Sequence, residues 1–149
     1  MKIALASDHR GFKLKNFLAQ FLASRGYVVN DFGTYSLDSC DYPDYMYPAS
    51  VAVRNNEADR AILICYTGVG SAIAANKVKG VRAALVSNVK SATLSRMHND
   101  ANVLVLPAYL VTKEEVKRIV AAWLKTSFEG GRHIRRLNKI KEIEEKENV

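Results

Sequence analysis

Residues 61–77 read AILICYTGVGSAIAANK and decide the fold of this 149-residue chain. The stretch begins with a short apolar run that ends at Cys65, passes through a loop of small residues with two glycines, and ends in an alanine-rich segment typical of a helix. A strand, a glycine loop and a helix in this order place unpartnered backbone N–H groups at a helix N-terminus. Because the helix dipole adds positive charge there, we expect the loop to attract an anion, with Cys65 at its mouth.

Four further β-rich runs flank this unit, and helical patterns separate them. The five predicted strands are 2–7, 27–32, 61–65, 81–86 and 103–106. Helices are predicted over 12–22, from a turn at 41–44 to Arg54, from Gly70 to near Gly80, and over 88–96 and 113–125. The last of them begins with a capping box, because Glu115 follows Thr112 by three residues.

Continuous apolar strands that alternate with helices indicate a parallel sheet covered on both faces. We therefore predict an α/β fold: a three-layer, doubly wound, flavodoxin-like sheet of five strands in the order 2-1-3-4-5. Its switch point lies between the first and third strands. The carboxyl ends of these strands carry Asp8, His9 and the glycine loop, so the topology predicts that they meet.

The net charge, the apolar runs and the cysteine content of the chain limit the classes of function that it can have. The formal net charge is +7, but no basic stripe with interleaved aromatic residues and no nucleic-acid motif accompanies it, so a phosphorylated small molecule is expected rather than nucleic acid. No apolar run is long enough to predict a membrane span, and the first residues enter a strand without a signal peptide. Two cysteines in different contexts suit a reducing compartment. We expect one cytoplasmic domain over 1–149.

Residues 128–149 differ from the rest, with a Gly-Gly hinge followed by a charged helical pattern. Its apolar residues form a narrow stripe at a spacing of three: Ile134, Leu137, Ile140 and Ile143. Such a helix can dock on a second subunit, which we expect, or pack on its own domain as a solvated helix. In this segment Arg132 and Arg136 lie one helical turn apart and could hold one phosphate, or form part of a solvated face.

Several polar residues have two interpretations from the residues alone. Cys65 is either an inert residue at a strand end or a reactive thiolate beside a helix N-terminus. Asp8 is either a helix cap or an acid–base group, and His98 is either a helix-end residue or a catalytic one. No histidine pair has metal-ligand spacing and the cysteines form no CxxC, so neither a metal nor another cofactor is expected.

Five motifs together resemble one family, the type B ribose-5-phosphate isomerases with their galactose-6-phosphate and allose-6-phosphate isomerase relatives. The resemblance runs in order along essentially the whole chain. It rests on SDHxG at 7–11, DYPD at 41–44, TGxG at 67–70 with AANK at 74–77, HNDAN at 98–102, and FEGGRH at 128–133.

The resemblance implies aldose–ketose isomerisation through a cis-enediolate, without a metal. It makes Cys65 the base between C1 and C2, Thr67 and His98 the groups that open the sugar ring, and Asp8 a proton shuttle. It implies that amides of the loop stabilise the enediolate, which involves Gly68, Val69, Gly70 and Ser71. Tyr42 and Asn99 would contact hydroxyls, and His9, Arg132 and Arg136 the phosphate. In the family two subunits share the site, so a homodimer or a dimer of dimers is implied.

Two departures from the family pattern leave alternatives open. The family usually has glycine directly after the cysteine, where this chain has Tyr66, and often an arginine after the fifth strand, where it has Pro107-Ala108-Tyr109. Ser71 stands where some members carry a carboxylate base, which leaves Cys65 in that role. The alternatives are an allose-6-phosphate or galactose-6-phosphate isomerase, and a catalytically silent phosphosugar-binding module.

Overall fold

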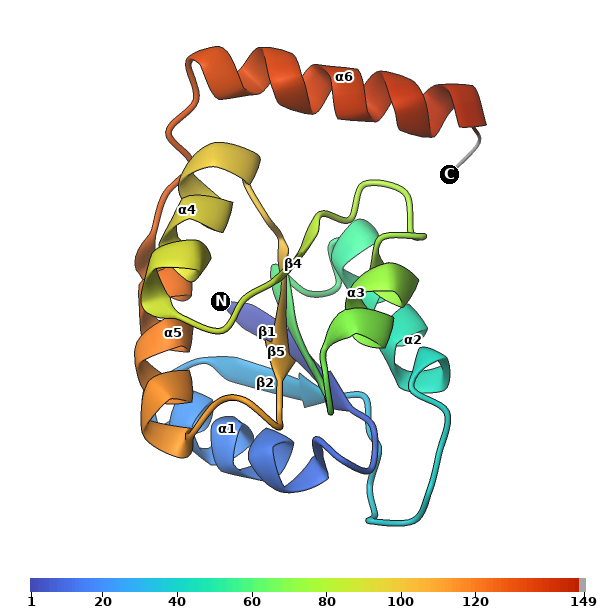
Figure 1. Ribbon diagram of the computed structural model, residues 1–149, viewed down its shortest axis with the longest axis vertical. Coiled ribbons are helices and arrows are strands. Elements are labelled where there is room, and N and C mark those ends of the chain that lie inside the picture. Colours follow the sequence, from blue (N-terminus) through green and yellow to red (C-terminus); the bar gives the residue numbers. More distant parts are fainter. Residues whose placement is uncertain (148–149) are drawn as a thin grey trace.

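The computed structural model describes residues 1–147 and builds them around one parallel sheet with helices on both faces (Figure 1). The strands are β1 (Lys2–Ser7), β2 (Val28–Asp31), β3 (Arg60–Cys65), β4 (Ala83–Leu85) and β5 (Val103–Pro107). All five predicted strands exist, and the α/β doubly wound class is confirmed.

The predicted strand order is wrong in one detail, because the observed order is β2-β1-β3-β5-β4. All of β5 is buried, and it pairs with β3 on one side and β4 on the other. By contrast β4 has only three residues, none of them fully buried, and it pairs with β5 alone. The more apolar strand takes the interior position, where both faces and both edges are covered. The switch point between β1 and β3 stays as predicted.

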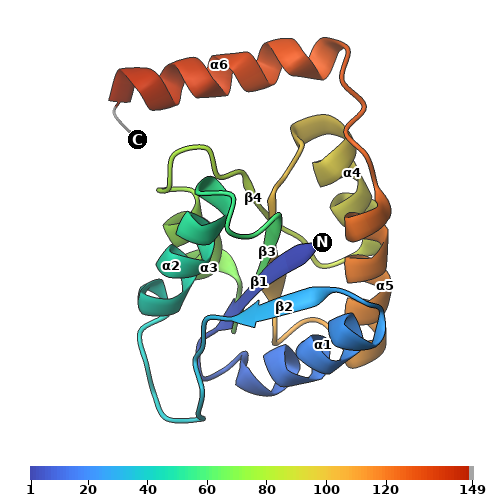
Figure 2. The same ribbon diagram turned by 180° about the vertical axis from the view of Figure 1, so that it is seen from behind.

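Alternate residues of the central strands point into two separate cores. On one face Ile3, Leu5, Ile62 and Ile64 pack under α1 (Phe12–Ser24), α4 (Val89–Asn99) and α5 (Lys113–Lys125). On the other face Ala4, Ala6, Leu63 and Cys65 pack under α2 (Pro43–Arg54) and α3 (Val69–Ala75). Figure 2 shows the same layers from behind. Because every strand pair is parallel, the carboxyl ends of all five strands share one edge of the sheet.

The helix predictions hold except for the extent of the third one. The capping box of α5 is present, with the Thr112 hydroxyl accepting from the Glu115 amide and the Glu115 carboxylate accepting from the Thr112 amide. The predicted helix from Gly70 to near Gly80 ends at Ala75 instead. There the Asn76 side chain bonds both backbone groups of Ala83, at 2.8 and 3.0 Å, and so turns the chain into β4.

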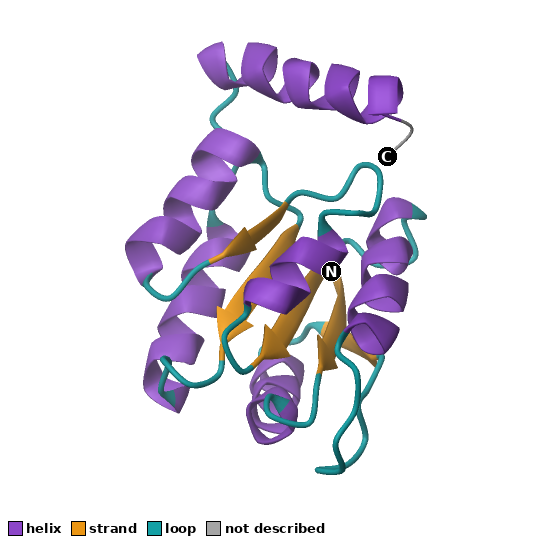
Figure 3. Ribbon diagram, turned by 45° about the vertical axis from the view of Figure 1, so that its right-hand side comes forward, coloured by secondary structure: helices purple, strands orange, loops and turns teal. Residues whose placement is uncertain are grey.

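The tail helix α6 (Arg132–Glu147) lies across the amino ends of the strands, opposite the edge to which the strands point (Figure 3). Within residues 1–147, one hydrogen bond joins the body of this helix to the loop before β4: the Gly80 amide donates to the Glu144 carboxylate at 3.0 Å. Ile134, Ile140 and Ile143 are 41–61% exposed, so the apolar stripe is largely uncovered in a single chain. Within residues 1–147, every helix is too short or too polar to span a bilayer.

Candidate active site

The carboxyl ends of β1 and β3 meet as the topology predicts. The backbone N–H of Asp8 donates to the carbonyl of Ile64 at 3.1 Å. Gly11 lies against the same carbonyl, and a Cβ added to it would sit 2.6 Å from that oxygen. Glycine is therefore required where the start of α1 crosses β3. These contacts bring Asp8 and His9 beside the loop that follows Cys65.

Cys65 ends β3 with its side chain on the α2–α3 face of the sheet. It is 4% exposed, and its Sγ accepts a hydrogen bond from the Gly68 amide at 3.2 Å. This bond needs the tight turn at Gly68, whose φ is +76° and whose added Cβ would meet a Leu85 methyl at 2.3 Å. The loop thus aims an N–H group at the sulfur, and such a bond strengthens when the sulfur carries negative charge.

The rest of the loop begins α3 and is covered by an aromatic ring. The Thr67 hydroxyl, which is exposed, accepts from the Val69 amide at 3.3 Å. The ring of Tyr42 lies on Gly70, where an added Cβ would be 2.6 Å from the ring. Ser71 is fully buried, and its Oγ has no hydrogen-bond partner among residues 1–147.

Asp8 and His9 each accept a hydrogen bond from a backbone amide, and each keeps one polar side-chain atom uncommitted within residues 1–147. Asp8 is 7% exposed, and its Oδ1 accepts from the Gly11 amide at 2.9 Å, so it does cap the turn before α1. Its second oxygen has no bond to residues 1–147. His9 is half-buried, and its Nδ1 accepts from the Cys40 amide at 3.3 Å. That bond leaves the other ring nitrogen, Nε2, as an N–H donor.

We call this group the carboxyl-edge cluster. It consists of Asp8, His9, Tyr42, Cys65 and loop residues 66–71.

The remaining predicted site residues lie at the opposite edge of the sheet. Helix α4 runs antiparallel to the strands and ends at Asn99, so His98 and Asn99 reach the amino ends. The Arg82 guanidinium, just before β4, donates to the carbonyls of Asn99 and Asp100 at 3.0 and 2.9 Å. A six-residue strand such as β3 spans about 20 Å. One chain therefore does not bring His98 and Asn99 to Cys65.

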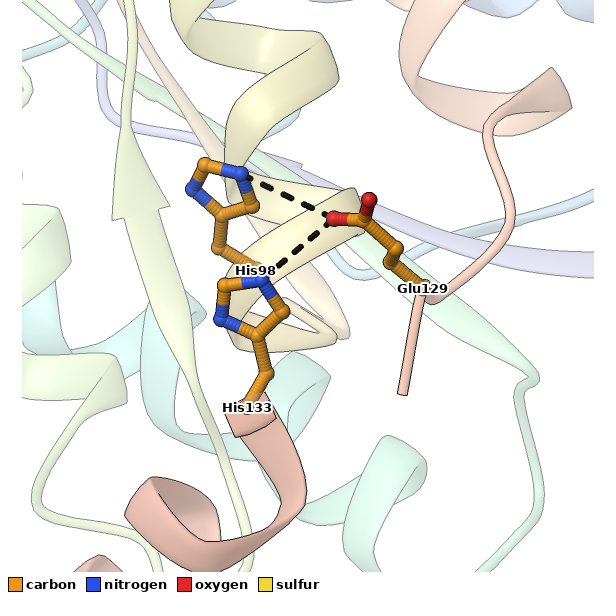
Figure 4. A group of neighbouring side chains, drawn as sticks. All are labelled: His98, Glu129 and His133. Atoms are coloured by element: carbon orange, nitrogen blue, oxygen red, sulfur yellow. Dashed lines mark ion pairs between the residues drawn. The ribbon is translucent and has the colours of Figure 1, made fainter. Parts of the chain in front are cut away.

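His98 belongs to a compact group with Glu129 and His133 (Figure 4). The two imidazoles stack with their centroids 4.4 Å apart and their planes 16° apart. One Glu129 oxygen lies 3.3 Å from His133 Nε2 and 3.9 Å from His98 Nε2. The Glu129 amide donates to the Met97 carbonyl at 3.0 Å, which fixes this segment to the end of α4. Sequence spacing did not predict this group, although Glu129 and His133 lie four residues apart.

The three side chains offer ligand atoms within 4.8 Å of one another, a separation that a shared metal ion could bridge. A metal bound by two imidazoles must lie in the plane of each ring. The planes of two stacked rings inclined by 16° do not meet within the roughly 2.0–2.1 Å of a zinc–nitrogen bond, so one ring would have to turn. As it stands, the geometry suits a carboxylate shared by two imidazoles better than a metal.

Arg132 and Arg136 are exposed in the first turns of α6, and His133 between them is 5% exposed. They extend the group around His98 along the same edge. We call the six residues the amino-edge cluster: His98, Asn99, Glu129, Arg132, His133 and Arg136. The predicted site is thus divided into two halves on opposite edges of one chain.

Comparison with known proteins identifies relatives along the whole chain. A family model described as Ribose/Galactose Isomerase matches residues 3–140. The chain is 48% identical over 147 residues to ribose-5-phosphate isomerase B of Escherichia coli, covering 99% of each. It superposes on a Clostridium thermocellum ribose-5-phosphate isomerase B structure with a TM-score of 0.97 at 51% identity, covering 98% of this chain and 99% of that one.

A second solved structure contains a ligand. The Mycoplasma genitalium ribose-5-phosphate isomerase B structure, with bound ribulose-5-phosphate, superposes with a TM-score of 0.93 at 46% identity. This superposition covers 97% of the present chain and 96% of the Mycoplasma genitalium chain.

Proposed function

The chain belongs to the ribose/galactose isomerase family, and we propose that its two clusters interconvert ribose 5-phosphate and ribulose 5-phosphate through an enediolate with Cys65 as the base. It is an aldose–ketose isomerase that acts on a phosphorylated sugar. The residue roles, the assembly and a cytoplasmic location, which suits two unpaired cysteines, are our proposals.

Cys65 carries the central step. The thiolate removes the proton from C2 of the open-chain aldose, and the electron pair moves through C1 to its carbonyl oxygen, giving the enediolate. The thiol then returns the proton to C1 while the C2 oxygen becomes the ketone. Asp8 moves the proton between the two oxygens through its uncommitted oxygen. The small loop suits this step because preorganised amides stabilise the oxyanion as it forms.

The loop amides divide into two groups. Those of Gly68 and Val69 already donate to Cys65 Sγ and Thr67 Oγ1. Of the other loop amides, that of Gly70 in the first turn of α3 is the one we assign to the enediolate, because Ser71 is fully buried.

The two clusters work together only between subunits. Thr67 at one edge and His98 at the other open the sugar ring, yet a strand of about 20 Å separates these edges in one chain. A homodimer, alone or paired into a tetramer, supplies the amino-edge cluster of one copy to the carboxyl-edge cluster of the other. Asn99 then contacts a hydroxyl, as Tyr42 does from the first copy. Arg132 and Arg136 bind the phosphate together with His9.

One observation carries the proposal: the buried Cys65 thiol receives an amide hydrogen bond within a glycine loop, and the adjoining end of β1 carries Asp8, whose amide bonds the Ile64 carbonyl. A silent phosphosugar-binding module needs the loop amides and the arginines. It has no need for a thiol and a carboxylate at the reacting carbons.

Proton NMR in deuterated water tests the activity directly. The purified protein is incubated with ribose 5-phosphate and, separately, with allose 6-phosphate. We expect ribulose 5-phosphate to appear with deuterium at the exchanged carbon. Turnover of the hexose alone would keep the mechanism and change the substrate. If neither sugar reacts although ribose 5-phosphate binds, the silent module is the correct account.

A further inference from the structure

Three side chains form a row on the rim of the carboxyl-edge cluster. The guanidinium carbon of Arg10 lies 5.1 Å from the ring centroid of Tyr66, and the rings of Tyr66 and Tyr109 lie 5.3 Å apart at 47°. Tyr66 is 49% exposed and Tyr109 57%, so the row faces outward. Tyr66 and Tyr109 stand at the two positions where the chain departs from the family pattern.

Backbone bonds hold the two tyrosines in place. The Tyr109 amide donates to the Tyr66 carbonyl at 3.1 Å, and the Ala108 amide donates to the Cys65 carbonyl at 2.9 Å. These bonds continue the pairing of β3 with β5 beyond the strand ends. The platform under Arg10 is therefore fixed to the residues that carry Cys65.

Arg10 is an exposed cation whose charge is not neutralised by any residue in the described range 1–147. No ion pair or hydrogen bond within residues 1–147 involves its guanidinium, whereas Arg82 and Arg96 both pair with Asp100. A guanidinium that rests its face on an aromatic ring keeps its N–H groups directed outward in its own plane. Such a group is preorganised to bind the oxygens of a phosphate or carboxylate.

The position of Arg10 suggests which anion it meets. It follows Asp8 and His9 directly, and its platform Tyr66 follows Cys65. When C1 and C2 of a sugar phosphate lie at Cys65, the phosphate at the other end of the molecule reaches the rim. We propose that Arg10, held on the Tyr66 ring, which in turn contacts the Tyr109 ring, binds the substrate phosphate. This inference rests on the proposed function and adds a residue to its binding site.

Arg25 provides a matched control at the other edge of the sheet. It is also exposed, its guanidinium carbon lies 5.2 Å from the ring centroid of Phe21, and no ion pair within residues 1–147 involves it. It follows the last residue of α1, away from Cys65. Arg10→Ala and Arg25→Ala therefore remove the same charge from the same kind of contact.

The test measures KM and kcat for ribose 5-phosphate and, by calorimetry, the Kd for inorganic phosphate. In Arg10→Ala we expect KM and the phosphate Kd each to rise about tenfold or more, with a much smaller change in kcat, because a charge-assisted contact is lost. Arg10→Lys should recover part of this loss, and Tyr66→Ala should show an intermediate loss. Arg25→Ala should match the wild type.

Two outcomes separate failure of this inference from failure of the proposed function. If KM and the phosphate Kd of Arg10→Ala stay within twofold of the wild type, Arg10 belongs to the solvated surface. If the wild type turns over no sugar phosphate, the calorimetric comparison with inorganic phosphate still tests Arg10. A phosphate Kd that is tenfold weaker in Arg10→Ala and unchanged in Arg25→Ala would support a phosphate-binding role for Arg10.

Discussion

Cys65 combines a packing role with a chemical one. Its side chain belongs to the core between the sheet and α2, together with Leu63, Ala75 and Val105. The same sulfur accepts the Gly68 amide at 3.2 Å. Burial alone would favour an inert residue, since free cysteines often pack as small hydrophobes. The hydrogen bond and the nearby Asp8 distinguish this cysteine from an inert one.

Replacing Cys65 with alanine should lower kcat about 10²–10⁴-fold, the usual contribution of a general base. The fold should persist, because alanine fits where the slightly larger thiol did. Steady-state kinetics with ribose 5-phosphate, with circular dichroism as the check on folding, measures both. Cys40→Ala removes the other thiol and should keep kcat within a few-fold. A Cys65→Ala enzyme with near-normal turnover would exclude the thiolate mechanism.

Two glycines of the loop should respond differently to alanine. Gly70 lies in α3 with its Cα under the Tyr42 ring, where a Cβ would be 2.6 Å from the ring. Gly70→Ala should therefore displace Tyr42 and raise KM several-fold, while thermal stability stays equal or rises, since alanine favours a helix by about 0.5–1 kcal/mol.

Gly68 supplies the contrast. Its φ of +76° and the Leu85 contact at 2.3 Å make Gly68→Ala a stability mutant. The left-handed conformation alone costs a residue with a Cβ about 1–2 kcal/mol. Thermal melting and KM are measured on both variants. A Gly68→Ala protein that melts at the same temperature as the wild type would contradict this assignment.

At the scale of elements, local sequence patterns predict which segments become strands but not which strands lie at the edges of the sheet. Apolar runs predict the strands, most clearly β1, β3 and β5, because a parallel strand that is buried on both faces must be apolar on both sides. The exchange of β4 and β5 in the sheet is not encoded in either run alone. It depends on which strand better tolerates an edge, and Ala83–Leu85 is the shorter and more exposed one.

Lys15 shows a second limit at this scale. Helical spacing correctly places Leu18 and Leu22 in the core, yet Lys15 is also fully buried. It is paired with Asp31 at 2.5 Å and lies between the rings of Phe12 and Tyr35. The partner that makes this burial tolerable lies at the end of β2, so no pattern within the helix could indicate it.

The capping box of α5 leads to a prediction about pH. Hydrogen bonds from the Thr112 backbone and side chain hold the pKa of Glu115 below its usual value of 4.5. A lowered carboxyl pKa stabilises the fold above the pKa of the unfolded chain and ceases to do so as the pH falls through the folded value. Glu115→Gln should therefore melt below the wild type at pH 7, and the gap should narrow as the pH is lowered toward 3.

Circular dichroism melts at both pH values measure this gap. Thr112→Ala, which removes the reciprocal bond, should lose about 1 kcal/mol of stability at pH 7. A gap for Glu115→Gln that is the same at pH 7 and pH 3 would show that its charge has no role in the cap.

For the whole molecule, topology predicts only half of the site. The meeting of Asp8 with the glycine loop follows from strand order, since β1 and β3 are neighbours. The stacking of His98 on His133 does not follow, because the path of residues 126–131 between α5 and α6 decides it. The same path leaves the Ile134, Ile140 and Ile143 stripe uncovered, as expected of a helix that docks on a second copy.

If two copies build each site, two inactive variants should restore activity when they exchange subunits. Cys65→Ala lacks the base but keeps its amino-edge cluster, and His98→Ala has the reverse defect. In a mixed dimer one of the two sites then contains both Cys65 and His98, while the other contains neither. Random exchange makes half of all dimers mixed, so about a quarter of wild-type kcat should return. The mixture is prepared by co-refolding, and each variant refolded alone is the control. Activity that stays at the level of the separate variants would mean that each chain completes its own site.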